Sequence, residues 1–479
     1  MFQYIVKRLL IFIPTLFVIS LMAFGLSKLA PGDPVELINR GGLSAGDGGQ
    51  LADMLATEQT YLQTAERLGL HAPVFYLSLS PISQSDTLYK VVKQGHQQML
   101  KNLTGQYGNW QQVSDYYKSL RTMEKEIYKV APDSANYTPR RKARRAVVDL
   151  FMEHKDNKIN RLLGEINTAS KADSSMFVLQ KPIEGLLNSY ASLKSEATPS
   201  KNYIPSLKFY GMDNQYHNWI TGFFVGDFGY SYLDNRPISS KMWDALRWTL
   251  IINFISILLA YLLSIPIGVN TAMRKDTPYD RIVTTVLFIL YSLPVFWTGT
   301  LLIVFFTTSE YGNVFNLFPT GGITDLPPSA PFMDRMLDLG HHLILPVVCI
   351  TYGSLAFISR QMRGGMLQVI GQDYIRTAKA KGLEEKQIIW KHAFRNSLFP
   401  IITLFASVFP LAIAGSVVIE VIFSIPGMGK LLFDSIISRD WPVVYTILML
   451  AAILTMVGNL IADMLYAVAD PRVTFNEQA

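Results

Sequence analysis

The sequence predicts an all-α membrane protein with six transmembrane helices and an external, mainly helical insertion. Only 17% of its 479 residues are charged and 49% are hydrophobic, whereas an average soluble domain is about 25% charged. The apolar residues are concentrated in blocks long enough to cross a bilayer, which takes about 20 residues in a helix. One long polar stretch separates the first block from the other five, and this stretch is where we expect the insertion.

Six blocks satisfy the length criterion, and a helix is suited to the bilayer because it pairs its own backbone polar groups. They are Leu9–Ser27, Trp248–Met273, Ile282–Thr308, His342–Ser359, Asn396–Ile419 and Val443–Val468. The first block could be a cleaved signal peptide, but its apolar part exceeds the usual length of roughly 7–15 residues. We therefore expect a retained helix. Pro14, Pro266 and Pro294 lie within blocks and are expected to kink them.

The short loops predict the orientation, because cytoplasmic loops carry an excess of Lys and Arg. The loop between the fourth and fifth blocks, residues 360–395, contains eight Lys or Arg residues, whereas residues 309–341 carry four acidic residues against one Arg. This pattern places both termini and loop 360–395 in the cytoplasm. We expect a multi-pass protein of the bacterial cytoplasmic (inner) membrane with residues 80–205 on the external, periplasmic side.

Composition and periodicity divide the chain into five parts. They are the first transmembrane helix (1–28), an external segment (29–79), an inserted helical domain (80–205), a second external segment (206–247) and a five-helix core (248–479). A helix over Leu51–Leu68 is expected to end at Gly69. Within the insertion, apolar spacing predicts helices at Leu88–Leu103, Gln111–Val130 and Met176–Leu193, and one helix of about 25 residues carrying Val148, Phe151, Met152, Ile159, Leu162, Leu163 and Ile166.

The insertion also carries a basic run, Arg140 to Arg145. Such a run could dock on an acidic partner or on anionic headgroups, but a solvated helix face is the simpler interpretation. No nucleic-acid-binding module accompanies the basic residues.

No motif in the sequence predicts catalysis, a resident cofactor or a metal site. The segment Gly427–Leu431 resembles a phosphate-binding loop but lacks its leading Gly and its hydroxyl residue. Cys349 is the single cysteine, and His341 and His342 have no further Cys or clustered His near them, so we expect them to pack at an interface. Among polar residues near the membrane blocks, Glu420, Asn459 and Asp463 could face an aqueous pathway or form a packing interface.

The basic loop is the most informative segment. It reads as a short helix of small residues from Asp373, a Gly382 that ends it in the left-handed conformation, and a second amphipathic helix leading to Asn396. A helix–turn–helix of this kind is suited to a groove on a soluble partner.

Four ordered motifs resemble the ABC-importer permeases of the oligopeptide/dipeptide/nickel family. The loop resembles their "EAA" loop in the form Y-x-R-T-A-x-A-K-G-L…K-H-A-x-R-N, with Pro400 following it. The other motifs are Tyr4–Leu9 with Leu29–Pro34, Gly226–Ser231, and Glu420–Lys430 with Asp470–Val473. The resemblance covers roughly residues 1–78 and 209–475 and points to the first of two homologous permeases of a peptide importer, while residues 80–205 depart from typical members.

The resemblance implies a non-enzymatic permease subunit that forms the pathway for di- or oligopeptides with a second permease. Two ABC ATPase chains would bind ATP and magnesium, so this chain needs no cofactor, and an external binding protein would deliver the substrate. The ATPase-coupling residues implied are Tyr374, Arg376, Thr377, Ala378, Ala380, Gly382, Leu383, Lys391, His392, Arg395 and Asn396. An external gate segment would contain Glu420, Pro426, Gly427 and Gly429.

Two alternatives stay open from the sequence. The same motifs occur in importers of nickel or another small solute, so the substrate class is not fixed. A membrane-anchored sensor or scaffold that uses the external helical domain is a different class, although no cytoplasmic signalling domain is present in the sequence.

Overall fold

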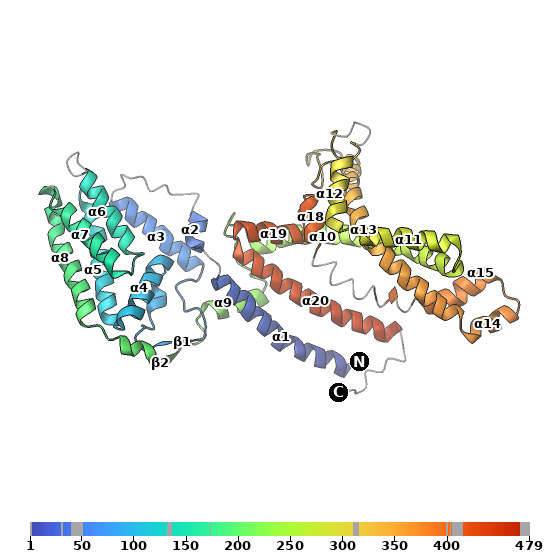
Figure 1. The fold of residues 1–479 in the computed structure, drawn as a ribbon, viewed down its shortest axis with the longest axis horizontal. Coiled ribbons are helices and arrows are strands. Elements are labelled where there is room, and N and C mark those ends of the chain that lie inside the picture. The colour runs from blue at the N-terminus through green and yellow to red at the C-terminus, as the bar shows by residue number, and fades with distance from the viewer. Residues whose placement is uncertain are drawn as a thin grey trace. The chain divides into compact units, whose positions relative to one another are not determined.

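The computed structural model describes residues 2–29, 32–39, 51–131, 137–172, 174–309, 316–398, 401–402, 404 and 415–469. The chain forms two compact units, one of residues 31–227 and one of residues 1–30 and 228–479. The predicted fold class is confirmed, since both units are built mainly of helices (Figure 1).

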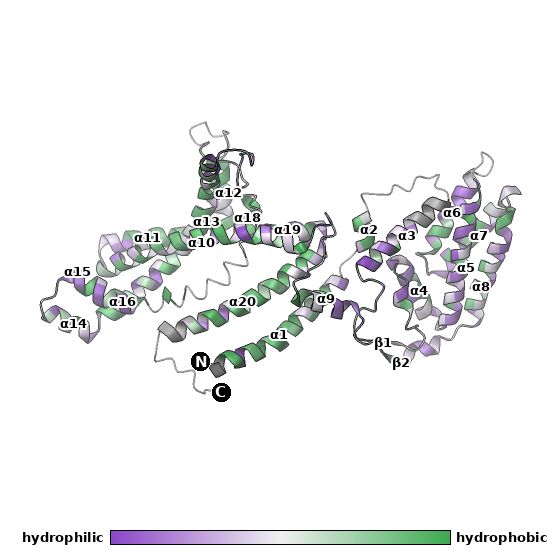
Figure 2. Ribbon diagram, turned by 180° about the vertical axis from the view of Figure 1, so that it is seen from behind, coloured by the Kyte–Doolittle hydropathy of each residue, from purple (hydrophilic) through white to green (hydrophobic). Residues whose placement is uncertain are grey.

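The membrane unit contains helices of strongly apolar composition (Figure 2). Its main elements are α1 (Phe2–Leu29), α10 (Ile238–Met273), α11 (Pro278–Ser292), α12 (Val295–Phe306), α13 (Phe332–Ile370), α18 (Val417–Ile422), α19 (Met428–Ser438) and α20 (Trp441–Ala469). Among the described residues, α1, α10, α13 and α20 each contain a segment long and apolar enough to cross a membrane, and α11 with α12 would make a fifth. The predicted span Asn396–Ile419 lies largely outside the described residues.

The third predicted block is not one continuous helix. Helices α11 and α12 meet at an angle of 91°, and Pro294 precedes α12 instead of lying inside a helix. Proline has no N–H for a helical hydrogen bond and its ring clashes with the preceding turn, so the helix breaks here. By contrast, Pro14 and Pro266 do lie inside α1 and α10, as expected.

Helices α10 and α13 run in the same direction and pack closely along their length. Small residues make the close approach possible: a Cβ on Gly268 would lie 2.6 Å from both the Met362 Cβ and the Ser359 carbonyl oxygen. The Ser359 hydroxyl donates to the Ser264 carbonyl at 3.2 Å. A parallel pair agrees with the predicted order of crossings, in which the second and fourth spans point the same way.

The second unit is a helical bundle with a two-stranded antiparallel ribbon. Strand β1 (Leu77–Pro81) pairs with β2 (Pro205–Phe209), and residues 82–204 lie between them in the chain. The bundle and its flanking helices are α2 (Pro34–Asn39), α3 (Leu51–Arg67), α4 (Gln94–Tyr107), α5 (Trp110–Lys129), α6 (Tyr137–Leu150), α7 (Asp156–Ser170), α8 (Gln180–Ser195) and α9 (Gln215–Phe224). Gly69, at which this helix is expected to end, lies two residues after α3 and is left-handed, with φ of 68°.

The prediction of a single helix of about 25 residues around Val148–Ile166 is wrong, because the structure has two helices there. The chain leaves the helix between α6 and α7, where the Glu153 carboxylate accepts from the backbone N–H groups of His154 and Lys155, both at 3.0 Å. Such local side-chain bonds compete with helical ones. Two residues of the predicted stripe, Val148 and Met152, are consequently exposed.

Two other helices of the bundle differ from prediction at their starts. A 3-10 turn, Leu88–Lys90, precedes α4, and another, Ser174–Leu179, precedes α8.

The basic run is mostly solvated, as the simpler interpretation expected, but Arg140 is buried and Arg144 stacks on the Tyr128 ring at 4.0 Å.

The bundle contains a buried histidine that has to be neutral. His96 stacks on Phe151 with ring centroids 4.2 Å apart, and its Nδ1 lies 3.0 Å from the Tyr117 hydroxyl. Burial, together with the positive charges of Lys93 and Arg121, lowers the pKa of His96 from 6.5 to about 3. Between these values the unfolded chain binds the extra proton, so the bundle loses stability as the pH falls through this range.

We predict that lowering the pH from 7 to 5 destabilises the bundle by up to about 2 kcal/mol through His96. Hydrogen exchange of the α4 and α5 amides in the full chain, corrected for intrinsic exchange rates, measures this change. His96→Gln removes the titrating group and should lose most of the dependence. An equal pH dependence in both proteins would contradict the assignment to His96.

Candidate functional site

The loop after α13 forms the predicted helix–turn–helix. Helix α14 (Asp373–Ala380) ends in a turn in which Gly382 N–H donates to the Lys379 carbonyl and Leu383 N–H to the Ala378 carbonyl. This pair of bonds is a Schellman motif, which requires a left-handed residue after the helix. Gly382 has φ of 74°, so it fills the position at which other residues are strained.

The second half of the loop is helical but irregular. Helix α15 (Glu385–Gln387) passes into a π-helical turn, Ile388–Ala393, and then into α16 (Phe394–Ser397). The sequence pattern predicted an ordinary amphipathic helix, and the wider turn is a difference that the apolar spacing did not reveal. Single π turns are often found at functional sites.

The loop is anchored on the last turns of the two long helices. Ile375 and Ala378 of α14, with Ile388 and Ala393, are buried in one cluster with α10 and α13 residues, among them Val269 and Met362. The Asn396 amide also donates to the Tyr374 hydroxyl at 2.8 Å, which ties the second half of the loop to α14. A displacement of the loop would therefore either move α10 and α13 with it or break these buried contacts.

The other face of the loop is open. Of the residues predicted for coupling, nine are exposed: Tyr374, Arg376, Thr377, Ala380, Gly382, Leu383, Lys391, Arg395 and Asn396. His392 is half-buried, and Ala378 is buried in the anchoring cluster. The sequence analysis missed Trp390, which is 46% exposed beside Phe394; a large aromatic residue between Ile389 and Lys391 was the available signal.

The predicted gate segment is organised by a buried carboxylate. Glu420 of α18 accepts from the backbone N–H of Lys430 at 3.0 Å, in the first turn of α19. The Thr249 hydroxyl donates to the same carboxylate at 2.9 Å and accepts from the Met428 N–H at 2.8 Å. The first N–H groups of a helix have no partner within it, and a negative charge is favourable at that end. Glu420 and Thr249 thus cap α19 and join it to α18 and α10.

Glycines make room for this cap. A Cβ on Gly427 would lie 2.5 Å from the Glu420 Cδ atom and 2.7 Å from the Thr249 hydroxyl oxygen. A Cβ on Gly429 would lie 2.7 Å from the Val417 Cα atom. Pro426 is exposed in the preceding turn. The sequence missed Thr249, which is far from the segment in the chain and has no distinguishing local pattern.

A second buried carboxylate holds the other end of α19. Asp440 accepts from the Tyr232 N–H at 2.8 Å and from the Ser231 hydroxyl, and Lys241 lies 3.6 Å from it. Lys241 also pairs with Asp234 at 3.1 Å. The motif that ends at Ser231 is therefore part of the support for α19, since both ends of this helix are fixed by buried carboxylates.

Asp463 forms an ion pair with Arg8 at 3.0 Å, where α20 packs along α1 (Figure 1). Asn459, one turn earlier, is exposed. This geometry favours the interface interpretation of Asp463.

A bidentate ion pair fastens α11 to α13. Arg363 donates through Nε and Nη2 to the two carboxylate oxygens of Asp280, at 3.0 and 2.7 Å. Asp280 is buried at the start of α11 and also accepts from the Asp276 N–H at 3.1 Å. The basic residue on α13 therefore has a structural partner, and it was not among the predicted site residues.

Comparisons with known proteins show the family of the chain. Residues 264–475 match the family described as "binding-protein-dependent transport system inner membrane component". The chain is 41% identical over 271 residues to the oligopeptide transport system permease protein AppB of Bacillus subtilis, covering 56% of this chain and 83% of AppB. It is 33% identical over 279 residues to the dipeptide transport system permease protein DppB of Escherichia coli, covering 55% and 81%. This chain belongs to the family of binding-protein-dependent transport system inner membrane components.

Proposed function

We propose that this chain is a permease subunit of an ATP-driven importer that carries di- or oligopeptides. The observation that carries the proposal is the exposed helix–turn–helix at 373–397, anchored on α10 and α13, in a chain related to oligopeptide and dipeptide permeases. Family membership argues against the sensor or scaffold alternative. The peptide class rests on the relatives, because peptides offer only generic backbone groups and termini for a pathway to contact.

The chain would act with partners that supply the chemistry. Two ATPase subunits would bind ATP and magnesium, a homologous second permease would complete the pathway, and an external binding protein would deliver the peptide. The exposed face of 373–397 would fit a groove on an ATPase. Because its buried face is continuous with α10 and α13, closure of the ATPase pair would move these helices and change which side of the pathway is open.

The proposed orientation follows the charges of the loops. With both termini and loop 360–395 in the cytoplasm, the α18–α19 segment lies near the external ends of α10 and α13, and residues 80–205 form an external domain. In this orientation α19 would gate the pathway from outside. Non-helical backbone is tolerated at such a position only where it is buried in protein or lines a cavity, and the Glu420 cap meets that requirement.

Replacement of Gly382 should uncouple the ATPase. Gly382→Val places a β-branched residue at φ of 74°, which costs about 1–2 kcal/mol and disturbs the turn, whereas Gly382→Asn is better tolerated because Asn visits this conformation. We expect Gly382→Val to reach the membrane but to retain several-fold less ATPase on co-purification. Gly382→Asn serves as the matched control. Wild-type retention of both ATPases and the second permease by the Val variant would contradict the coupling role.

Replacement of Gly427 should impair the gate. The methyl group of Gly427→Ala would displace the Glu420 carboxylate from α19, and loss of a helix cap costs about 0.5–2 kcal/mol. We expect several-fold slower peptide uptake at equal membrane content. Gly340→Ala is the control, because a Cβ there meets nothing within 4 Å. Unchanged uptake by Gly427→Ala would show that the capped turn does not control the pathway.

A further inference from the structure

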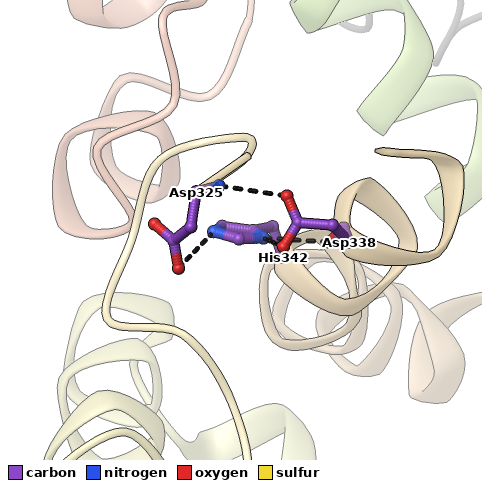
Figure 3. A group of neighbouring side chains, drawn as sticks. All are labelled: Asp325, Asp338 and His342. Carbon is purple, nitrogen blue, oxygen red and sulfur yellow. Dashed lines mark hydrogen bonds and ion pairs between the residues drawn. The ribbon is translucent and has the colours of Figure 1, made fainter. Parts of the chain in front are cut away.

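A histidine and two carboxylates meet outside the coupling loop and outside the residues predicted for the gate. Asp338 and His342 lie one turn apart on α13, and Asp325 lies on the loop that precedes this helix (Figure 3). The Asp325 N–H donates to the Asp338 carboxylate at 3.0 Å, and the Thr324 hydroxyl donates to the same oxygen. The loop is therefore already folded so that the Asp325 carboxylate faces the imidazole.

The hydrogen bond of the His342 Nδ1 atom determines which ring nitrogen carries the proton when the ring is neutral. His342 Nδ1 lies 2.9 Å from the Asp338 carbonyl oxygen; a carbonyl can only accept, so Nδ1 carries the proton. When the ring carries only this one proton, Nε2 presents a lone pair. The His342 side chain is 1% exposed, and Nε2 has no hydrogen-bond partner within the part of the chain that the structure describes.

A positive charge at Nε2, from a bound cation or from a proton, makes the contact with the acidic residue it faces favourable. The Asp325 Oδ2 atom lies 3.6 Å from Nε2, and a lone pair facing a carboxylate at this distance is repulsive. Ligands bound at about 2.0–2.2 Å to a tetrahedral zinc ion lie roughly 3.4 Å apart, which is close to the observed separation. One ligand atom from each of Asp325, Asp338 and His342 lies within 4.8 Å of the others. In this structure the Asp338 Oδ1 atom lies beside Nδ1, 3.4 Å away (Figure 3), so the Asp338 carboxylate has to turn toward Nε2 to share an ion with it.

We propose that Asp325, Asp338 and His342 bind a divalent transition-metal ion of the zinc type. One imidazole and two carboxylates favour such an ion over magnesium or calcium, which prefer all-oxygen sites. The two negative charges balance the charge of the ion. The Nδ1–H bond to the Asp338 carbonyl is the supporting contact that metal-binding histidines usually have. Asp325 is 75% exposed, so the ion can enter from solvent and complete its coordination with water.

This site differs from the prediction that the two histidines only pack at an interface and that the chain holds no metal. That prediction considered Cys and His as ligands. The fold adds two carboxylates to His342, whereas the neighbouring His341 contacts the Leu317 carbonyl through Nε2 at 2.7 Å and is not among these ligands.

The position of the site suggests what a bound ion would do. The same loop contacts the segment that follows α18, where the Gly322 N–H donates to the Phe423 carbonyl at 2.9 Å. An ion joining Asp325 to α13 would therefore brace this loop against the segment that begins at Glu420. Metal binding itself does not depend on the transport function proposed above.

The test uses the full-length chain without a histidine tag, reconstituted in lipid nanodiscs and stripped of metal with a chelator. Zinc binding is measured by competition with a chromophoric chelator, and cobalt is added separately to record its visible spectrum. We expect one zinc ion per chain. Asp325→Asn should weaken binding by about tenfold or more and alter the cobalt spectrum, and it should not affect folding because Asp325 is exposed.

Asp334→Asn is the matched control, since it removes an exposed carboxylate from α13 outside the site; it should bind zinc like the unmodified chain. His342→Gln tests the buried ligand, with hydrogen exchange confirming that α13 is folded. The proposal is overturned if the unmodified chain binds no stoichiometric zinc, in which case a proton on Nε2 would balance Asp325. Equal zinc affinity in the Asp325→Asn and Asp334→Asn variants would also overturn it.

Discussion

The lack of water in a bilayer is the constraint on which the membrane unit depends. Every buried polar group of the backbone has to find a partner within the protein. At α19 the need is met by Glu420 and Thr249 at its start, while Asp440 holds the neighbouring segment after its end. Because Glu420 serves three helices at once, the capped turn can move only if all three move with it or if the carboxylate leaves. The cap thus couples the position of this turn to those of α10 and α18.

The same constraint explains the path from the loop at 373–397 to the membrane helices. Between apolar helices in lipid, close packing replaces the hydrophobic effect as the source of association, and α10 and α13 achieve it with Gly268 and the serines beside it. The buried face of α14 continues this packing through Ile375 and Ala378. The loop and the two helices are thus joined through side chains that are already in contact.

Much of this arrangement could be predicted from local patterns. Apolar block length identified α1, α10, α13 and α20, and Gly382 was expected in its left-handed turn. Two predicted helices failed for local reasons. The Glu153 carboxylate binds backbone N–H groups and interrupts an apparently continuous apolar stripe, and Pro294 separates two helices. Thr249, Asp325 and Asp338 could not be found, because a Thr or Asp has no local signal for a partner that only the fold brings near. Residue roles in coupling and gating stay predictions.

The measurement that tests the central claim most directly is uptake in cells with and without this chain. A labelled dipeptide, a labelled pentapeptide and radioactive nickel are supplied separately, each with and without depletion of ATP. The account predicts that removal of the chain abolishes ATP-dependent uptake of at least one peptide and leaves nickel uptake unchanged. Loss of nickel uptake alone, or unchanged uptake of both peptides, would contradict it.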